Sequence, residues 1–230
     1  MLFHVDAILF DIDGTLVDST AAVTRTWRTW AGVHGFDAEE ILRVCHGRRS
    51  EDTVAALLPE EHRAAAVIEL ERMELSDLSD VIALPATRRL LTELPPSRWA
   101  AVTSGSRRLM LARLATAGLP APEVLISAED VTVGKPDPEG YLRAAGALGR
   151  DARRCLVIED APAGIRAGRA AGARVLAVAT SHPAAGLAAA DEVIADLTAC
   201  RVESTAEGLV VRTTDQADGT HRTPTGLTGR

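Results

Sequence analysis

The sequence contains few cysteines and few aromatic residues. Its 230 residues include only three cysteines, Cys45, Cys155 and Cys200, and no two of them have CxxC spacing. This number and spacing exclude a small disulfide framework and argue against a zinc knuckle, so we expect free thiols in a reducing compartment. Aromatic residues make up only 3% of the chain, but 47% of it is hydrophobic, enough for the core of one globular unit.

Long hydrophobic runs and an excess of basic residues are also missing. No stretch approaches the roughly 18 apolar residues that a membrane span requires, and no signal-peptide pattern precedes the first apolar run. The 32 acidic residues outnumber the 25 basic ones, whereas nucleic-acid binding relies on lysine and arginine to neutralise phosphates. We therefore expect a cytoplasmic monomer or weak dimer that binds a small molecule rather than nucleic acid or a membrane.

Short apolar runs alternate with segments of helical length along most of the chain. Most runs are too short for a helix and are bounded by turn or polar residues, so they predict buried strands. These runs are residues 5–10, 99–103, 124–127, 155–158 and 174–178. Helical spacing of apolar residues fills segments such as 109–117, 141–148 and 165–170. The alternation predicts an α/β fold, a doubly wound, Rossmann-like parallel sheet with helices on both faces.

Turn residues mark the ends of the expected helices. Asp137 followed by Pro138 predicts a helix start, with the aspartate as N-cap and the proline as the first helical residue. Gly118, Gly149 and Gly172 stand where helices are expected to end. These boundaries are those of crossover helices between parallel strands.

One interval is too long for a crossover connection. About 88 residues separate the strand that ends near Phe10 from the one that starts near Trp99, whereas a crossover needs about a dozen or a few more. Helical patterns cover 19–34, 50–58 and 61–75 within this interval. We therefore expect a helical cap at 18–84 inserted into a core made of 1–17 and 85–200.

Two further segments are interpreted structurally. Trp27 and Trp30 lie on one face of the first cap pattern, and tryptophans at helical spacing favour packing over ligand binding. The sequence after residue 200 predicts a hairpin within 201–213. The segment 214–230 is rich in glycine, threonine and charge, which predicts a disordered tail.

The segment DIDGT, at 11–15, directly follows the first predicted strand. Side chains two residues apart on an extended chain point to the same side, so Asp11 and Asp13 can face one site, and Gly14 permits a sharp turn. Ligands of open α/β sheets bind at this end of the strands. Because aspartate and glycine are also common turn residues, the pair alone leaves an ordinary strand end as an equal alternative.

Polar residues also gather at other predicted strand ends and loops. They are Thr103, Ser104 and Gly105, then Lys135, then Glu159 and Asp160. Each has an ordinary alternative, which is helix capping for Thr103 and Asp160 and a solvated surface position for Lys135. In a doubly wound sheet, however, all of them meet around one crevice, where hydroxyls and backbone N–H groups can hold an anion.

Four segments resemble, in their order and their residues, the motifs of the haloacid dehalogenase superfamily of phosphohydrolases. DIDGT is similar to its first motif, VTSG to the second, the lysine of GKPDP to the third and EDAPAG to the fourth. The resemblance implies that Asp11 is the nucleophile that forms an aspartyl-phosphate and that Asp13 is the general acid and base. It also implies that Thr103 and Lys135 bind the transferring phosphoryl group.

The same resemblance implies a Mg²⁺ site. Asp11, Glu159, Asp160 and the main-chain carbonyl of Asp13 would hold the ion. Such hard oxygen ligands suit Mg²⁺. The physical need is independent of the family, because a carboxylate that attacks a phosphate monoester brings two negative charges together, which a divalent cation and a lysine offset.

The cap segment CHGRRSED, at 45–52, offers candidate contacts to the rest of the substrate. His46, Gly47, Arg48 and Arg49, together with Ser104 and Gly105 of the core, are the predicted substrate-binding residues. Arginines in such a turn can bind hydroxyls or a second anionic group. The equal alternative is that both arginines pair with the carboxylates that follow them on an exposed helix start.

This segment and the motifs most resemble the branch that contains glycerol-phosphate and 2-deoxyglucose-6-phosphate phosphatases. The resemblance implies Mg²⁺-dependent hydrolysis of a small phosphorylated metabolite, a sugar, polyol or glycerol phosphate. That branch has an aromatic residue where this chain has Arg48, and an added cation favours a more acidic substrate. The alternatives are therefore a phosphoglycolate phosphatase, a phosphomutase like β-phosphoglucomutase and, outside the enzymes, a phosphate-binding regulatory protein.

Overall fold

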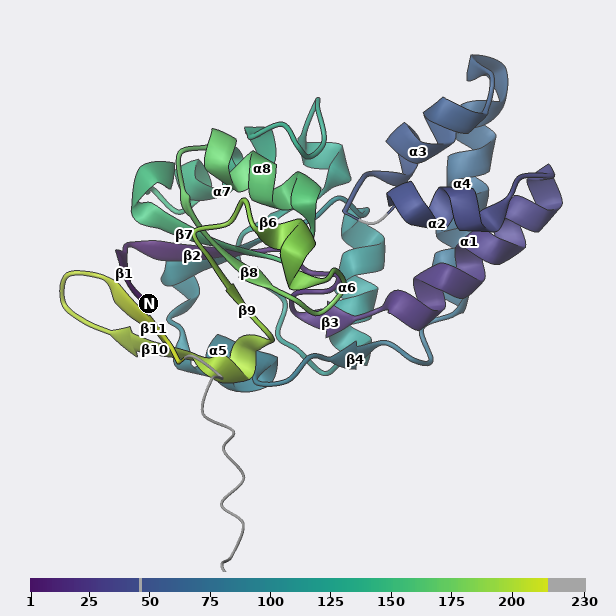
Figure 1. Cartoon of the computed structure of the whole chain (residues 1–230). Coiled ribbons are helices and arrows are strands. Elements are labelled where there is room, and N and C mark those ends of the chain that lie inside the picture. The colour runs from purple at the N-terminus through teal and green to yellow at the C-terminus, as the bar shows by residue number, and fades with distance from the viewer. Residues whose placement is uncertain (46, 215–230) are drawn as a thin grey trace, which may run out of the picture.

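The central feature of the fold is a parallel sheet. A computed structural model describes residues 1–45 and 47–214, and in it six strands lie in the order β6, β5, β2, β7, β8, β9, all parallel (Figure 1). Their bounds are Ala7–Phe10 for β2, Trp99–Val102 for β5, Leu125–Ile126 for β6, Cys155–Glu159 for β7, Arg174–Val178 for β8 and Glu192–Ile194 for β9. The predicted α/β fold is confirmed, and β2, which leads into DIDGT, lies between β5 and β7.

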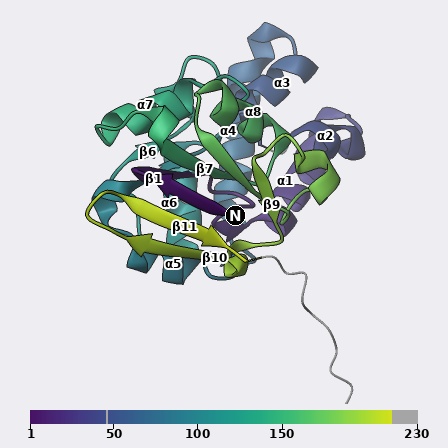
Figure 2. The ribbon, with the colours of Figure 1, turned by 60° about the vertical axis from the view of Figure 1, so that its left-hand side comes forward.

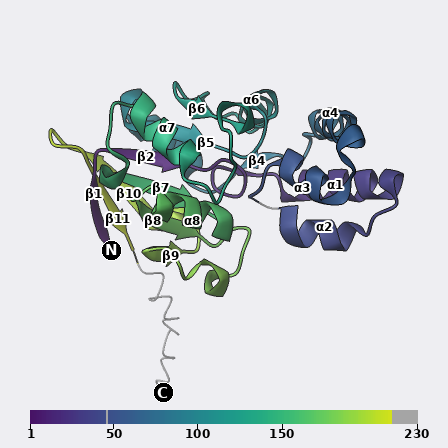
Figure 3. The same ribbon diagram turned by 90° about the horizontal axis from the view of Figure 1, so that it is seen from above.

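Helices cover both faces of this sheet (Figure 3). They are α5 (Thr87–Glu93), α6 (Arg107–Thr116), α7 (Glu139–Ala147) and α8 (Pro162–Ala170). Because side chains alternate along a strand, β2 contributes to both layers: Ile8 and Phe10 pack with residues of α5 and α6, whereas Ala7 and Leu9 pack with residues of α7 and α8. The apolar run in β2 is therefore buried on both sides.

A helical cap is inserted after β2. Its helices are α1 (Thr20–His34), α2 (Ala38–Cys45), α3 (Ser50–Leu57) and α4 (Glu60–Ser76), and the short antiparallel pair β3 (Val17–Asp18) and β4 (Ile82–Ala83) joins it to the core. Trp27 and Trp30 are buried in the apolar centre of the cap, as predicted. The eight-residue helix α2 was not predicted. It begins after Asp37, whose carboxylate accepts a hydrogen bond from the N–H of Glu39.

A second, smaller sheet contains three strands in the order β1, β11, β10. β10 (Cys200–Ser204) and β11 (Leu209–Thr213) pair antiparallel in the region of the expected hairpin, and β1 (Leu2–Val5) pairs with β11 (Figure 2). The prediction of one strand over 5–10 is wrong, because the chain changes sheets at Asp6, which forms an ion pair with Arg154 at 2.7 Å. Short 3₁₀ helices cover Pro96–Arg98, Ala128–Asp130, Ala152–Arg154, Ala184–Leu187 and Leu197–Ala199.

Several helices begin and end close to the predicted residues. Gly118, Gly149 and Gly172 have positive φ angles of 64°, 67° and 82° at helix ends. α7 begins at Glu139, so Pro138 precedes the helix instead of opening it, and the Asp137 carboxylate accepts the Glu139 N–H at 2.9 Å.

None of the helices in residues 1–45 and 47–214 is long and apolar enough to cross a membrane. Of the expected tail, 214–230, only Thr214 lies within the described residues.

Candidate active site

The loops at the carboxyl ends of β2, β5 and β7 meet around a buried lysine. The Lys135 ammonium lies 2.5 Å from Asp11 Oδ1, 2.7 Å from Glu159 Oε1 and 3.2 Å from the carbonyl oxygen of Val102. Burial opposes the charged form of Lys135, but attraction by Asp11 and Glu159 outweighs it and raises its pKa well above the usual value. The predicted convergence of Asp11, Lys135 and Glu159 is thus present in the structure.

Three carboxylates form a cluster that fits a divalent cation. One oxygen each of Asp11, Glu159 and Asp160 lies within 4.8 Å of the others, and all three residues are buried. Burial raises the pKa of Asp11 to about 8, and burial followed by repulsion from Glu159 and Asp11 raises that of Asp160. When all three carboxylates are ionised, they and Lys135 together carry two negative charges, which is the charge that a divalent cation neutralises.

The Glu159 carboxylate accepts four hydrogen bonds from within the protein. Its Oε2 accepts the N–H groups of Asp160 and Ala161 at 2.9 and 3.0 Å, and its Oε1 accepts the Tyr141 hydroxyl at 3.0 Å besides Lys135. Tyr141 was predicted only as part of an apolar helix face, because its hydroxyl contact lies 18 residues away in the chain. Glu159 is consequently held in one orientation from four directions.

The loop after β5 lines the mouth of the site. Thr103 is 6% exposed, and its Oγ1 accepts the N–H of Gly105 at 3.0 Å, while Ser104 Oγ donates to the carbonyl of Gly47 at 3.1 Å. Gly47 has φ +73°, and a Cβ there would lie 2.8 Å from the Cβ of Ala161. The turn of the cap therefore sits directly on the core at a position that has no room for a side chain.

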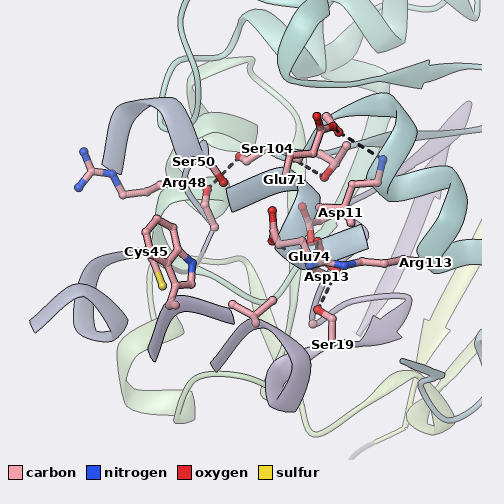
Figure 4. Close-up of a pocket in the computed structure, with 18 of the residues that line it drawn as sticks. Asp11, Asp13, Ser19, Cys45, Arg48, Ser50, Glu71, Glu74, Ser104 and Arg113 are labelled. Atoms are coloured by element: carbon pink, nitrogen blue, oxygen red, sulfur yellow. Dashed lines mark hydrogen bonds and ion pairs between the residues drawn. The ribbon is translucent and has the colours of Figure 1, made fainter. Parts of the chain in front are cut away.

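A pocket between cap and core opens onto Asp11 and Asp13 (Figure 4). From the cap it is lined by Val23, Trp27, Cys45, Gly47, Arg48, Ser50, Glu51, Val67, Glu71 and Glu74. From the core it is lined mainly by Thr103, Ser104, Gly105, Ser106, Leu109, Arg113, Glu129, Asp160 and Ser181. Apart from the carboxylate cluster, the wall is thus rich in hydroxyl and carboxylate groups.

Asp13 lies on this pocket but its carboxylate belongs to a second network. Its Oδ1 accepts the Ser19 hydroxyl at 2.7 Å, and its Oδ2 accepts Arg113 Nη1 at 2.7 Å. Arg113 Nη2 donates to Glu74 Oε1 of α4 at 3.0 Å. The Asp13 carboxylate is thus not part of the three-carboxylate cluster, and the predicted metal contact of Asp13 was through its main-chain carbonyl.

The two predicted cap arginines are placed differently. Arg49 forms an ion pair with Asp52 at 2.9 Å and donates to the carbonyls of Val131 and Thr132 at 3.4 Å, so it lies outside the lining of the Asp11 pocket. Arg48 borders that pocket, but it is exposed and its guanidinium points away from Asp11 (Figure 4). For Arg49 the pairing with a following carboxylate, one of the two interpretations of the sequence, is observed. His46 lies outside the described residues.

Several pocket residues were not predicted from the sequence. Arg113, Glu74, Glu71 and Ser106 line the pocket, and Ser106 donates a hydrogen bond to Glu71 across the boundary between core and cap. Arg113 alone left a signal, because it is a charged residue one helical turn after Leu109 on a face that is otherwise apolar. The others lie in segments whose pattern indicates only an exposed helix or a helix cap.

The family of the chain follows from comparison with known proteins. Residues 5–172 match the family model described as haloacid dehalogenase-like hydrolase. The chain belongs to this family, as the sequence motifs predicted, and it is a phosphatase of the haloacid dehalogenase type.

Individual relatives agree with this assignment. The chain is 45% identical to hexitol phosphatase A of Escherichia coli over 74% of its own length and 81% of the relative's. It is 35% identical to 2-deoxyglucose-6-phosphate phosphatase 2 of Saccharomyces cerevisiae over 91% and 96% of the two chains. A hydrolase from Pseudomonas syringae superposes with a TM-score of 0.77 at 25% identity and covers 83% of this chain and 94% of its own.

The packing around Glu159 predicts the effect of one small substitution. A Cβ at Gly164 in α8 would lie 1.5 Å from Oε1 of Glu159, a residue whose carboxylate is held by two donors on each oxygen. We expect Gly164→Ala to lower the free energy of unfolding by roughly 1–3 kcal/mol through overpacking, measured by urea denaturation. Gly146→Ala in α7 is the control, because nothing lies within 4 Å of its Cβ and alanine is the better helix former. Equal stability of the two variants would contradict this account.

Proposed function

We propose that the protein hydrolyses phosphate monoesters of small, neutral sugars or polyols, with Mg²⁺ and through an aspartyl-phosphate on Asp11. The observation that supports this most strongly is the buried contact of Lys135 with Asp11 beside the carboxylate cluster. A lysine in this position neutralises the carboxylate before reaction and can contact the transferring phosphoryl group afterwards. The phosphatase names of the relatives are in agreement.

In the proposed reaction, an oxygen of Asp11 attacks phosphorus and the bond to the substrate's alcohol oxygen breaks. Asp13 gives its proton to that oxygen, so a neutral alcohol leaves. Asp13 then removes a proton from the water that attacks the aspartyl-phosphate, which releases phosphate and restores Asp11. Thr103 and the N–H groups of its loop bind the phosphoryl oxygens. Mg²⁺ held by Asp11, Glu159, Asp160 and the Asp13 carbonyl would offset the charge of the phosphoryl group.

The charge of the pocket supports a neutral leaving group. Glu51, Glu71 and Glu129 line it. Of its two arginines, Arg48 points away from Asp11, and Arg113 is already paired with Asp13 and Glu74. Carboxylates accept hydrogen bonds from hydroxyls but repel a second carboxylate or phosphate. This counts against phosphoglycolate and against the bisphosphate that a phosphomutase needs. A hexitol phosphate and 2-deoxyglucose 6-phosphate, which the names of two relatives indicate, fit this chemistry.

The nucleophile is tested by Asp11→Asn. We expect the rate of phosphate release to fall by at least about 10³-fold, because an amide cannot attack phosphorus, while the fold is kept. Phosphate release is measured alongside circular dichroism. Asp37→Asn is the matched control: Asp37 is exposed and does not line the pocket, and asparagine also caps α2. Retained turnover in Asp11→Asn would overturn the proposed mechanism.

The substrate class is tested by a phosphate-release screen. We expect kcat/KM for sorbitol 6-phosphate and 2-deoxyglucose 6-phosphate to exceed that for phosphoglycolate by at least about tenfold, because the glutamates of the pocket repel a carboxylate. The same reactions are followed by NMR for isomerised sugar phosphate. A preference for phosphoglycolate, or isomerisation without phosphate release, would refute the proposed substrate class.

The metal site predicts a dependence of cation binding on pH. Because burial raises the pKa of Asp11 to about 8 in the metal-free protein, this group is protonated below that pH and must lose its proton to bind a cation. The affinity for Mg²⁺ should therefore weaken as pH falls from 8 to 6, by up to roughly tenfold per pH unit for each proton released. Isothermal titration calorimetry with Mg²⁺ measures this. An affinity that is equal at both pH values would contradict it.

A further inference from the structure

One buried arginine in the pocket wall connects three parts of the molecule. Arg113 lies in α6 of the core and is 3% exposed. Its Nη1 lies 2.7 Å from Asp13 Oδ2, after the first strand, and its Nη2 lies 3.0 Å from Glu74 Oε1, near the end of cap helix α4. Figure 4 shows the guanidinium between the two carboxylates. These contacts join residues 100 and 39 positions apart in the sequence.

This arrangement fixes the Asp13 carboxylate at both oxygens. Ser19 donates to Oδ1 at 2.7 Å, while Arg113 donates to Oδ2. Ser19 stands at the N-cap position of α1, yet its side chain makes no capping hydrogen bond and turns to Asp13 instead. Rotation of this carboxylate about its last bond would break both hydrogen bonds, so two donors hold its plane more firmly than one donor would.

Packing alone does not account for an arginine at this position. The neighbouring side chains on the same face of α6, Leu109 and Leu114, are buried in an apolar cluster, and a buried ion pair is seldom more stable than apolar residues of similar volume. The planar guanidinium offers what a leucine or a lysine does not, which is two donors at fixed spacing for two carboxylates. The arginine therefore contributes to the orientation of the Asp13 carboxylate rather than to packing.

The second carboxylate makes that geometry depend on the cap. Glu74 is 8% exposed, and burial raises its pKa to about 7 although Arg113 opposes this. It reaches Arg113 only when α4 lies against α6, as in this structure, where Ser106 at the start of α6 also donates to Glu71 of α4. If the cap moved off the core, Arg113 would lose one of its two carboxylates.

We propose that Arg113 is a positioning residue that orients Asp13 toward the leaving oxygen, and that Glu74 holds Arg113 in this orientation when the cap is seated on the core. The inference rests on the proposed role of Asp13 as the general acid. Its consequence is selective. Loss of Arg113 impairs proton donation to an alkoxide, but it leaves attack by Asp11 on phosphorus unaffected.

The test compares leaving groups that need a proton with leaving groups that do not. Sorbitol 6-phosphate releases an alkoxide, whereas p-nitrophenyl phosphate and acetyl phosphate release stable anions. The rate compared is that of leaving-group release in a single turnover, because hydrolysis of the aspartyl-phosphate, which also uses Asp13, is common to all three substrates. For Arg113→Gln we expect this rate to fall by about 10²-fold on sorbitol 6-phosphate, since general acid catalysis contributes about 10²–10⁴-fold. On the other two substrates it should fall by less than about threefold, because their leaving groups need no proton. Glu74→Gln should show a smaller loss with the same preference.

The controls separate positioning from stability. Arg108→Gln, an exposed arginine of the same helix, should leave all rates unchanged. Because the ratio of the leaving-group release rates on two substrates does not depend on the folded fraction of a sample, a destabilised variant remains informative. Arg113→Lys should restore part of the sorbitol 6-phosphate rate, since an ammonium still donates to one carboxylate.

The outcomes separate this inference from the proposed function. Equal losses on all three substrates, or no loss on any, would overturn the role of Arg113 while Asp11→Asn still abolishes turnover. Turnover that survives in Asp11→Asn would instead overturn the proposed function itself. A selective loss on sorbitol 6-phosphate, repeated in Asp13→Asn, supports the inference.

Discussion

A lysine ammonium buried between two carboxylates is the interaction on which the centre of this molecule depends. Lys135 contacts Asp11, Glu159 and the last carbonyl of β5, so it joins the ends of the neighbouring strands β5, β2 and β7. Removing the ammonium would leave uncompensated buried charge, an effect of roughly 3–5 kcal/mol in other proteins. The surrounding structure serves this contact: Tyr141 and two backbone N–H groups hold Glu159, and Gly164 leaves room for its carboxylate.

The charges of the buried side chains affect both the stability of the fold and the proposed chemistry, because the same groups serve both. Three buried carboxylates with one lysine are repulsive by themselves, and a bound divalent cation removes that repulsion. Next to them, the Asp13–Arg113–Glu74 network is balanced differently, because one guanidinium satisfies two carboxylates without a metal. The two networks lie side by side on one pocket, and they divide it into a part that holds the buried carboxylate cluster and a part that connects to the cap.

Most of the sheet could be predicted from local pattern. The apolar runs at 99–103, 155–158 and 174–178 are strands β5, β7 and β8, within one residue at each end. The run at 5–10 was misjudged because its apolar pattern continues through Asp6, where the chain passes from one sheet to another. That change is decided by pairing of β1 with β11, more than 200 residues away, and no local pattern reports it.

Local pattern was enough to predict which groups of the core meet. DIDGT, Thr103, Glu159 and Asp160 end or follow buried strands, Lys135 lies in the loop before α7, and parallel strands bring their carboxyl ends to one edge. Which side chains of the cap face these groups could not be predicted in this way. The two arginines of the predicted cap motif point elsewhere, while Glu71 and Glu74 of the cap, together with Arg113 of the core, form the polar wall. The reason is physical: strand ends are aligned by backbone pairing, whereas contacts between cap and core depend on how whole helices pack, which side-chain periodicity does not specify.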